Sequence, residues 1–412
     1  ALIAEQGAYE LESVADQEEL FYQIVEPDGQ MGEREKLDLD LRDQIVERLR
    51  NELNDRVDAT VTFSDIDVSL LSTFPTLTAE VSELAITGKG EFAEVTFLKA
   101  KSVGAGIDLM GLVLKRETTI ESIEVNTPEL HLIVRPDGKA NYDIVPEEEG
   151  GSEAPSEALA FEIKRFRIND GSLTYVSPSI RINVVGLEHD GRAKISGAVQ
   201  ELSLETAVKE LSARLDGVQY VKKAKASVDV NATLDTDKER LTLHAVDAAI
   251  QQLALEGAGE IGWAGPGTAL DLTLASKTGL PIKALISAIP NAYAADFEGL
   301  TASGTFSLSA AIQGELGPDD EDIPSFSATA KVQNGAFKYP DLPLGVTDLL
   351  LDGSVKHPGG NLDKMRIDVS KYAFAAGKSQ AKGRVTVTRP ISQPRIDLAL
   401  DGRFDLEELS KA

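Results

Sequence analysis

Hydrophobic residues recur at every second position along most of this chain, and this alternation limits the possible folds more than any other feature. Successive side chains of a β-strand point to opposite faces, so each such segment has one apolar and one polar face. One-sided strands are typical of antiparallel sheets, because buried parallel strands are apolar on both faces. The clearest segments are Val57, Ala59, Val61 and Phe63; Ile66 and Val68; Ile123, Val125 and Thr127; Leu130, Leu132 and Val134; Ala226, Val228, Val230, Ala232 and Leu234; Leu270, Leu272 and Leu274; Phe306, Leu308, Ala310 and Ile312; Phe326, Ala328, Ala330 and Val332; and Ile396, Leu398 and Leu400.

Short turn sequences separate these segments. "PDGK" (136–139) and "LDTDKER" (234–240) each lie between two apolar runs and predict hairpin turns. In the first, Pro136 presets φ and Gly138 tolerates a positive φ. The sequence therefore predicts a long antiparallel array of hairpins.

Helices are expected at only three places. Leu41, Ile45, Leu49 and Leu53 recur every four residues, which predicts an amphipathic helix over 37–53. "GLPIKALISAIP" (279–290) is typical of a helix with a proline in its first turn and another at its end. "FDLEELSKA" at the terminus indicates the start of a third helix.

An internal repeat is visible. "NDGSLTYVSPSIRINVVGLEHDG" (169–191) is similar to "QNGAFKYPDLPLGVTDLLLDG" (333–353), aligning Gly171 with Gly335. Each copy leads through further strands to a closing stretch, "IKALISA" or "LEELSKA". Repetition at this scale predicts an extended body built from added units, which we expect to continue past the second copy.

Composition excludes several partners. A formal net charge of −27 argues against nucleic acid, because neutralising phosphates requires a basic surface. The chain has no Cys, which excludes disulfides and thiolate chemistry. No window approaches about 18 consecutive apolar residues, so no membrane-spanning helix is predicted, and the first residues do not read as a signal peptide.

A search for catalytic or cofactor chemistry identifies no site. His131, His189, His244 and His357 never fall three or four residues apart, and no nucleophile elbow, P-loop or dinucleotide fingerprint occurs. Two acidic breaks, 146–157 and 314–325, are interpreted as links or loop tips, and the carboxylates of the second lack the spacing of an EF-hand. We therefore expect no enzyme activity, no metal and no cofactor.

One short segment leaves an alternative open. "IVRPDGKANYDIV" (133–145) gathers Asp137, Asn141 and Asp143, as a small catalytic loop would. The Pro-Asp-Gly sequence favours a hairpin tip instead.

The apolar strand faces must be hidden or occupied. Two sheets packed as a sandwich would fill the interior, whereas one strongly curved sheet would leave an apolar trough. A trough would suit acyl chains, because each CH₂ moved out of water gains about 0.8 kcal/mol. Strand alternation does not choose between the two. The residues that would line such a trough are Ile123, Val125, Leu130, Leu132, Val228, Val230, Leu272, Leu274, Phe306, Leu308, Ile396 and Leu398.

Several motifs resemble those of a known family. "FSDIDVSLLSTFP", "LAITGKGEF", "GIDLMGLV", "IESIEVNTPELHL" and "DGKANYDI" occur in order within 57–145, and "YPDLP" and "FDLEELSKA" follow later. Together they resemble AsmA-family envelope proteins over residues 37 to 412. The resemblance implies a mainly β fold with few helices: an elongated, strongly curved antiparallel sheet forming a repeating β-groove with a chorein-like N-terminal part.

The resemblance also implies an organisation and a role. Residues 1–36 would be a polar extension, 37–146 the N-terminal helix and start of the groove, 147–157 an acidic linker or loop, and 158–412 the groove body. Family members are anchored in the inner membrane and project into the periplasm, with proposed roles in phospholipid transport and outer-membrane assembly. We expect an acyl lipid as ligand and contact with the inner and possibly the outer membrane. The alternatives are a periplasmic scaffold acting on outer-membrane protein assembly and, with less support, a hydrolase on a β-scaffold.

Overall fold

A computed structural model describes residue 54 and residues 57–69, 76–108, 118–144, 160–277, 279–287, 299–317 and 323–409. The helix expected over 37–53, the acidic stretch 146–157 and the carboxylates of 319–322 lie outside the described residues. The chain divides into two compact units. Unit 1 comprises residues up to Gly171 together with Lys194–Gly197, and unit 2 comprises Ser172–Ala193 together with Ala198–Ala412.

The described part is mainly β, with only short helices, as the alternation predicts. Unit 1 contains β1 (Ala59–Thr62), β2 (Asp65–Ser69), β3 (Thr76–Gly88), the 3₁₀ helix η1 (Gly90–Phe92), β4 (Thr96–Asp108), β5 (Thr118–Asn126), β6 (Glu129–Ile133) and the first part of β7 (Ala160–Val176). Strands β1 and β2 pair antiparallel with one edge of β3, and β4 pairs with the other. Strands β5 and β6 follow one another along the far edge of β4.

One pairing differs from the expected antiparallel sheet. Strands β5 and β7 are parallel, with Ile120 opposite Ile163 and Val125 opposite Ile168. Parallel neighbours need a crossover of a dozen or more residues, and the chain between β6 and β7 (134–159) is long enough to supply one. This parallel pair is an exception within the mainly antiparallel sheet that the sequence predicts, and strand patterning does not reveal it because it depends on the path of that connection.

The hairpin tip itself is as predicted. The Gly138 amide donates to the Arg135 carbonyl over 2.9 Å, Gly138 has φ +86°, and Val134 pairs with Ala140. Asn141 is buried, and its side chain accepts from the Ile133 amide (2.8 Å) and donates to the His131 carbonyl (2.6 Å). Asn141 therefore locks the hairpin and is not gathered with carboxylates for catalysis.

Unit 1 contains a small closed core. Val61, Phe63 and Ile66 are 5 to 6% exposed and pack together. Val81 and Leu84 both pack against this cluster although they are three residues apart in one strand. Glu83, between them, has φ +51° and shifts the alternation by one position.

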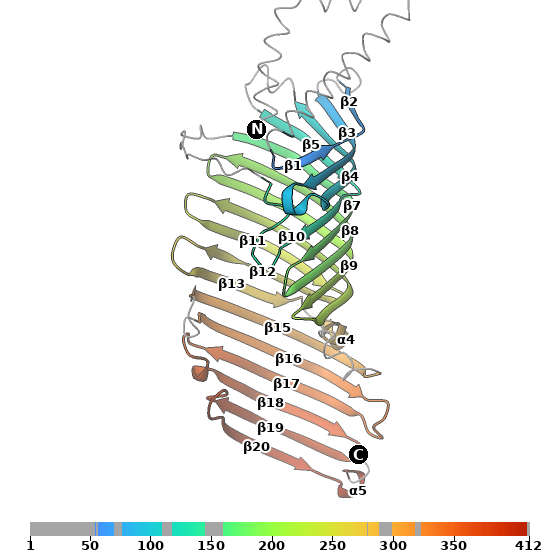
Figure 1. Cartoon of the computed structure of the whole chain (residues 1–412). Helices are drawn as coiled ribbons and strands as arrows, with labels where there is room; N and C mark the ends of the chain where they lie inside the picture. The colour runs from blue at the N-terminus through green and yellow to red at the C-terminus, as the bar shows by residue number, and fades with distance from the viewer. Residues whose placement is uncertain are drawn as a thin grey trace, which may run out of the picture. The chain divides into compact units, whose positions relative to one another are not determined.

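Unit 2 contains the remaining described strands (Figure 1). They are β8 (Ile180–Ser196), β9 (Val199–Leu215), β10 (Val218–Asp235), β11 (Arg240–Ile250), β12 (Leu253–Gly262), β13 (Thr268–Ser276), β14 (Leu280–Pro281), β15 (Thr301–Leu316), β16 (Ser325–Lys338), β17 (Val346–His357), β18 (Arg366–Ala376), β19 (Ser379–Thr388) and β20 (Arg395–Arg403), with helices α4 (Ile282–Ser287), η4 (Leu362–Lys364) and α5 (Leu406–Leu409). From β9 to β20 the strands pair antiparallel in sequence order, except that β15 pairs with both β13 and β14.

The helix expected over 279–290 is shorter in the structure. It begins at Ile282, because Leu280 and Pro281 form the short strand β14 against β15. Its described part ends at Ser287. Helix α5 begins within "FDLEELSKA", as expected.

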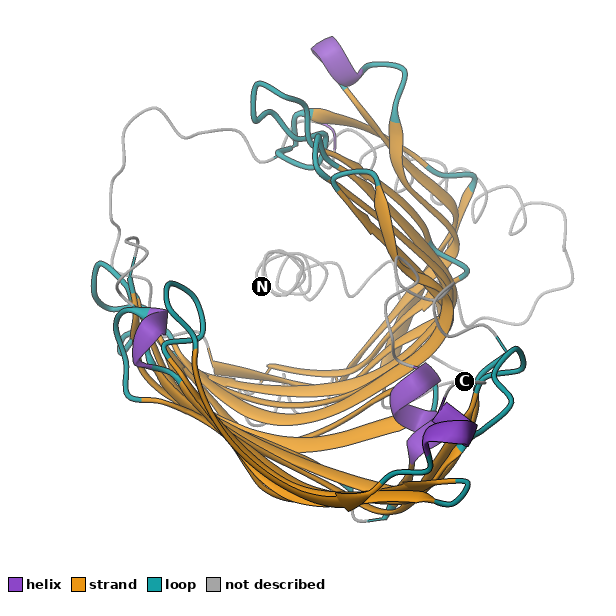
Figure 2. Cartoon of the chain, turned by 90° about the horizontal axis from the view of Figure 1, so that it is seen from below, coloured by secondary structure: helices purple, strands orange, loops and turns teal. Residues whose placement is uncertain are grey.

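The strands of unit 2 are bent into arcs (Figure 2), and bulges at neighbouring positions account for the bending. The pairing register shifts beside Gly304 in β15, Asn334 in β16 and Asp348 in β17, all three of which have positive φ. Each bulge inserts an unpaired residue, which bends the strand and increases its twist. Bulges on consecutive strands therefore curve the sheet.

The internal repeat has a structural counterpart. Asp170 (φ +49°) precedes buried Gly171 in β7, and Asn334 (φ +50°) precedes buried Gly335 in β16. Asn and Asp are among the few non-glycine residues that adopt this conformation readily. The aligned residues thus form the same local feature in both copies.

Candidate functional site: the apolar face of unit 2

One row of side chains in unit 2 is apolar across eleven consecutive strands. Following the pairing register from β9 to β20, every position is aliphatic or glycine. This apolar row consists of Leu204, Val230, Val246, Gly257, Leu274, Ala310, Ala328, Val355, Ile367, Val387 and Ile396. Alternation on each strand places the neighbouring rows on the same face, which we call the apolar face.

The predicted trough residues of unit 2 all lie on this face. Val230, Leu274 and Ile396 belong to the apolar row itself. Four others lie two positions away along their strands: Val228, Leu272, Leu308 and Leu398. Phe306 is also on this side, but it is 5% exposed, so little of its side chain is accessible.

No second sheet covers the apolar face among the described residues of unit 2. Helix α4 packs locally against β12, β14 and β15, and otherwise each strand contacts its neighbours in the sheet. Leu274 is 39% exposed in the middle of the sheet, and Ile396 and Leu398 are 66% and 57% exposed at its edge. Side chains of this size in a filled sandwich would be almost fully buried.

The predicted residues of unit 1 lie on β5 and β6. Ile123 is opposite Ala105 and Phe166, and Val125 is opposite Val103. Leu130 pairs with Leu98. These side chains and that of Leu132 are half-buried.

The opposite face of unit 2 is polar and carries a row of carboxylates. Glu205, Asp229, Asp247 and Glu256 are directly opposite one another on β9 to β12. Cross-strand partners lie about 5 Å apart, where like charges repel. On these four strands the sheet is therefore apolar on one face and anionic on the other, and we call the four carboxylates the acidic row.

Lys277 offsets part of this repulsion. Its ammonium lies 2.7 Å from an Asp247 carboxylate oxygen. That hydrogen bond, with the nearby charges of Asp247, Glu256 and Asp229, raises the pKa of Lys277.

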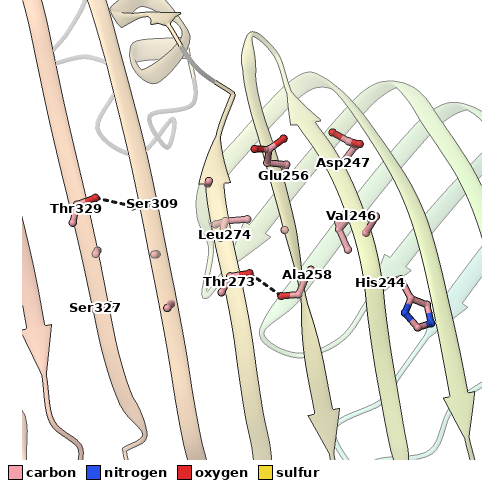
Figure 3. Close-up of a pocket in the computed structure, with 16 residues that line it drawn as sticks. His244, Val246, Asp247, Glu256, Ala258, Thr273, Leu274, Ser309, Ser327 and Thr329 are labelled. Atoms are coloured by element: carbon pink, nitrogen blue, oxygen red, sulfur yellow. Dashed lines mark hydrogen bonds between the residues drawn. The ribbon is translucent and has the colours of Figure 1, made fainter.

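A hollow over the middle strands of unit 2 is lined by residues of both faces, among them Val246 and Leu274 of the apolar row and Asp247 and Thr273 of the polar face (Figure 3). It encloses about 580 Å³ over β11, β12, β13, β15 and β16, and small residues such as Ala245, Ala275 and Ala311 are among those that line it. Its hydroxyls are used within the sheet, since Ser309 bonds Thr329 (2.7 Å) and Thr273 donates to the Ala258 carbonyl (3.2 Å). The hollow arises from short side chains between longer ones and gathers no nucleophile with a base.

The four histidines are dispersed. His131 is exposed on β6, as expected, and His244 bonds the Thr233 hydroxyl (2.8 Å). His357 is buried, stacks on Phe326 with 4.8 Å between ring centroids, and accepts from the Gly359 amide (3.2 Å).

His189 is the histidine with a shifted pKa. It bonds the Thr206 hydroxyl (2.8 Å), and partial burial lowers its pKa from the ordinary value. No group of three or more His, Asp or Glu within the described ranges could hold a metal ion.

Sequence reasoning missed the structural roles of two polar residues. Asn141 and His357 are both buried and hydrogen-bonded to backbone. The Asn after the Pro-Asp-Gly turn was one available signal, since Asn side chains commonly bond nearby backbone. The acidic row carried no sequence signal, because it depends on the register of four strands.

Comparison with known proteins now identifies the family. The profile of the AsmA family matches residues 39–283, which is more than half of the chain. The chain belongs to the AsmA family. The match extends from before β1 into α4 and so includes the described part of unit 1 together with β8 to β13. Searches of curated proteins and of solved structures returned no significant match. None of the helices in the described ranges has the length and apolar character needed to cross a bilayer.

Proposed function

We propose that this AsmA-family protein is a non-enzymatic lipid-binding protein of the bacterial envelope, and that the apolar face of unit 2 holds phospholipid acyl chains. The observation that carries the proposal is the apolar row: it is eleven strands wide, aliphatic or glycine throughout, and no second layer covers it among the described residues of unit 2. Uncovered apolar surfaces of this extent are rare on soluble proteins unless something binds there.

The dimensions suit a lipid. Ten steps between neighbouring strands, at about 4.8 Å each, give the row a length of about 48 Å. The hydrocarbon core of a bilayer is about 30 Å thick, so the row exceeds the length of two opposed acyl chains. A lipid tail can therefore lie along the row at several equivalent positions.

The chemistry favours movement over storage. Each CH₂ leaving water contributes about 0.8 kcal/mol, so a sixteen-carbon chain is held firmly without a specific contact. An aliphatic wall holds the chain about equally well at each position, so sliding costs little. The proposed role is therefore conduction of phospholipid between the inner and outer membranes, along the apolar face of unit 2.

The location is part of the same proposal. Family resemblance supports a periplasmic protein attached to the inner membrane and working toward outer-membrane assembly and homeostasis. Headgroups would remain in water beyond the apolar face. The acidic row on the polar side would repel anionic headgroups and so favour one side of the sheet.

A scaffold acting on outer-membrane protein assembly is the second candidate. It predicts protein partners and requires no lipid on the apolar face.

The test introduces charge on one face of β10. Val228→Asp with Val230→Asp places two carboxylates on the apolar face, and Ser227→Asp with Asn231→Asp places the same two on the polar face of the same strand. Purified proteins are mixed with vesicles of fluorescent phospholipid, and lipid extraction and transfer are measured.

We expect the first variant to lose extraction and transfer and the second to keep both. Circular dichroism melts establish that both variants are folded. If the first variant is unfolded, the test uses Leu274→Asp instead, at a position that is 39% exposed. Its control is Thr273→Asp on the polar face of the same strand. Equal transfer by both members of a pair would overturn the proposal.

A further inference from the structure

The only Trp of the chain lies where the apolar face reaches a turn. Trp263 follows the last residue of β12, and its amide donates to the Glu239 carbonyl over 2.9 Å, which continues the pairing of β12 with β11. Because successive side chains alternate, Trp263 lies on the same side as Ile261 and Gly259, which is the side of the apolar face. Trp263 is 42% exposed. A large aromatic residue therefore ends the apolar face at residues 263–267, which we call the rim turn.

The rim turn joins strands in the interior of the sheet. Strands β12, β13 and β15 are each paired on both sides, so the exposure of Trp263 does not come from an unpaired strand. Leu316 is opposite Thr268 beside the turn and is 47% exposed on the same face. At the opposite ends of these strands, α4 packs against β12 and β15. The apolar face is thus bounded by a helix at one rim and by the exposed Trp263 and Leu316 at the other.

A hollow of about 300 Å³ adjoins the rim turn and is lined by charged residues. Its cations are paired: Arg240 lies 3.4 Å from Glu260, and Lys238 lies 2.7 Å from the carboxylate three residues before it. Glu315 lies so close to the turn that a Cβ added to Gly267 would be 2.7 Å from its carboxylate oxygen. Glu315 forms no ion pair with any residue in the described ranges. The hollow therefore presents one carboxylate that can receive a cation.

We infer that the rim turn is where a phospholipid headgroup leaves the apolar face, and that this headgroup is zwitterionic, with an amine as well as a phosphate. The inference rests on the proposed function, because it requires acyl chains on the apolar face. The indole of Trp263 packs against the first methylenes and donates its Nε1–H to the ester or phosphate, the depth at which Trp is enriched in bilayers. The amine then lies beside Glu315, whereas a purely anionic headgroup is repelled by that carboxylate.

The distance from the rim turn to the apolar row suits one acyl chain. Gly257 of the row and Trp263 are separated by about 20 Å along β12, at about 3.3 Å per residue. Each leaflet of a bilayer contributes about half of a hydrocarbon core that is about 30 Å thick. A lipid whose ester is held at Trp263 therefore extends its acyl chain most of the way to the row.

Trp263 is itself the probe in the first experiment, so the unmodified protein is used. The protein is loaded from phosphatidylcholine vesicles in which the lipid is brominated either near the ester or near the methyl end of its acyl chains. It is separated from the vesicles before Trp quenching is measured. We expect bromines near the ester to quench Trp263 more strongly. The matched variant Leu274→Trp with Trp263→Phe places the Trp on the apolar row and should show the reverse order.

The two probes separate failure of this inference from failure of the proposed function. Quenching at position 274 with none at Trp263 would overturn the inference alone. Equal or stronger quenching of Trp263 by the bromines near the methyl end would do the same. No quenching at either position would overturn the inference and the proposed function together.

A second measurement tests the amine. The protein extracts lipid from phosphatidylcholine vesicles that carry equal amounts of fluorescent phosphatidylethanolamine and phosphatidylglycerol. We expect a preference for the ethanolamine lipid, and Glu315→Gln should reduce it about two- to fivefold, as for the loss of one exposed charge pair. Glu205→Gln removes a carboxylate of the acidic row outside the hollow and should leave the preference unchanged. An unchanged preference in Glu315→Gln, or an equal reduction in Glu205→Gln, would overturn the pairing of the amine with Glu315.

Discussion

The two units differ in whether their apolar side chains are covered. In unit 1, Val61, Phe63 and Ile66 form a closed cluster that neighbouring side chains cover. In unit 2, a longer run of aliphatic residues lies on one face of a sheet with no second layer among the described residues. The same period-two alternation produces both. The difference shows that alternation specifies which residues share a face but not whether that face is filled.

The largest expected contrast is between a core and a face substitution. Phe63→Ala should reduce the free energy of unfolding by about 3–5 kcal/mol, because it leaves a cavity in a closed cluster. Leu274→Ala, at a 39% exposed position, should cost about 1 kcal/mol or less. Denaturant unfolding followed by circular dichroism measures both, and equal losses would show that the apolar face is in fact covered.

The next largest effect concerns the Asn141 side chain, which bonds backbone groups in unit 1. Asn141→Ala removes the buried side chain that bonds the Ile133 amide and the His131 carbonyl, leaving these partly buried backbone groups without that partner. Such a loss costs about 1–3 kcal/mol. Hydrogen exchange of residues 129–141 should increase in this variant. Asp143→Ala, at the exposed end of the same hairpin, serves as the control and should leave exchange unchanged.

The apolar row illustrates how much of the structure the sequence can predict. Alternation placed Val230, Leu274 and Ile396 on strands and on the apolar side of each. It could not predict that they share one row, because the row depends on register, and register depends on bulges such as those at Asn334 and Asp348. The parallel pairing of β5 with β7 was missed for a related reason: it is set by the path of a long connection, which strand patterning does not record.

A smaller effect concerns the acidic row of unit 2. Repulsion among Glu205, Asp229, Asp247 and Glu256 is screened by salt, since the Debye length falls from about 10 Å at 0.1 M to about 3 Å at 1 M. Raising NaCl over that range should therefore increase the melting temperature. Lys277→Gln removes the cation beside Asp247 and should steepen this dependence. A melting temperature that falls with added NaCl would contradict the arrangement.

The smallest effect is a pH dependence at His189. Burial holds its folded pKa below the ordinary 6.5, so the unfolded chain binds the proton more readily. The resulting contribution to stability is complete above pH 6.5 and is lost as the pH falls through the folded pKa. His189→Gln should remove this part of the pH profile of the melting temperature. An unchanged profile in His189→Gln would show that the imidazole is not buried in solution.

The most direct test of the account places one fluorophore on either face of β13. The only Trp, Trp263, is replaced by Phe, and a single Trp is introduced as Leu274→Trp on the apolar face or Thr273→Trp on the polar face. Each protein is mixed with phospholipid brominated in its acyl chains, which quenches Trp on contact. The account predicts strong quenching at position 274 and little at position 273. Equal quenching at both positions, or none at 274, would contradict it.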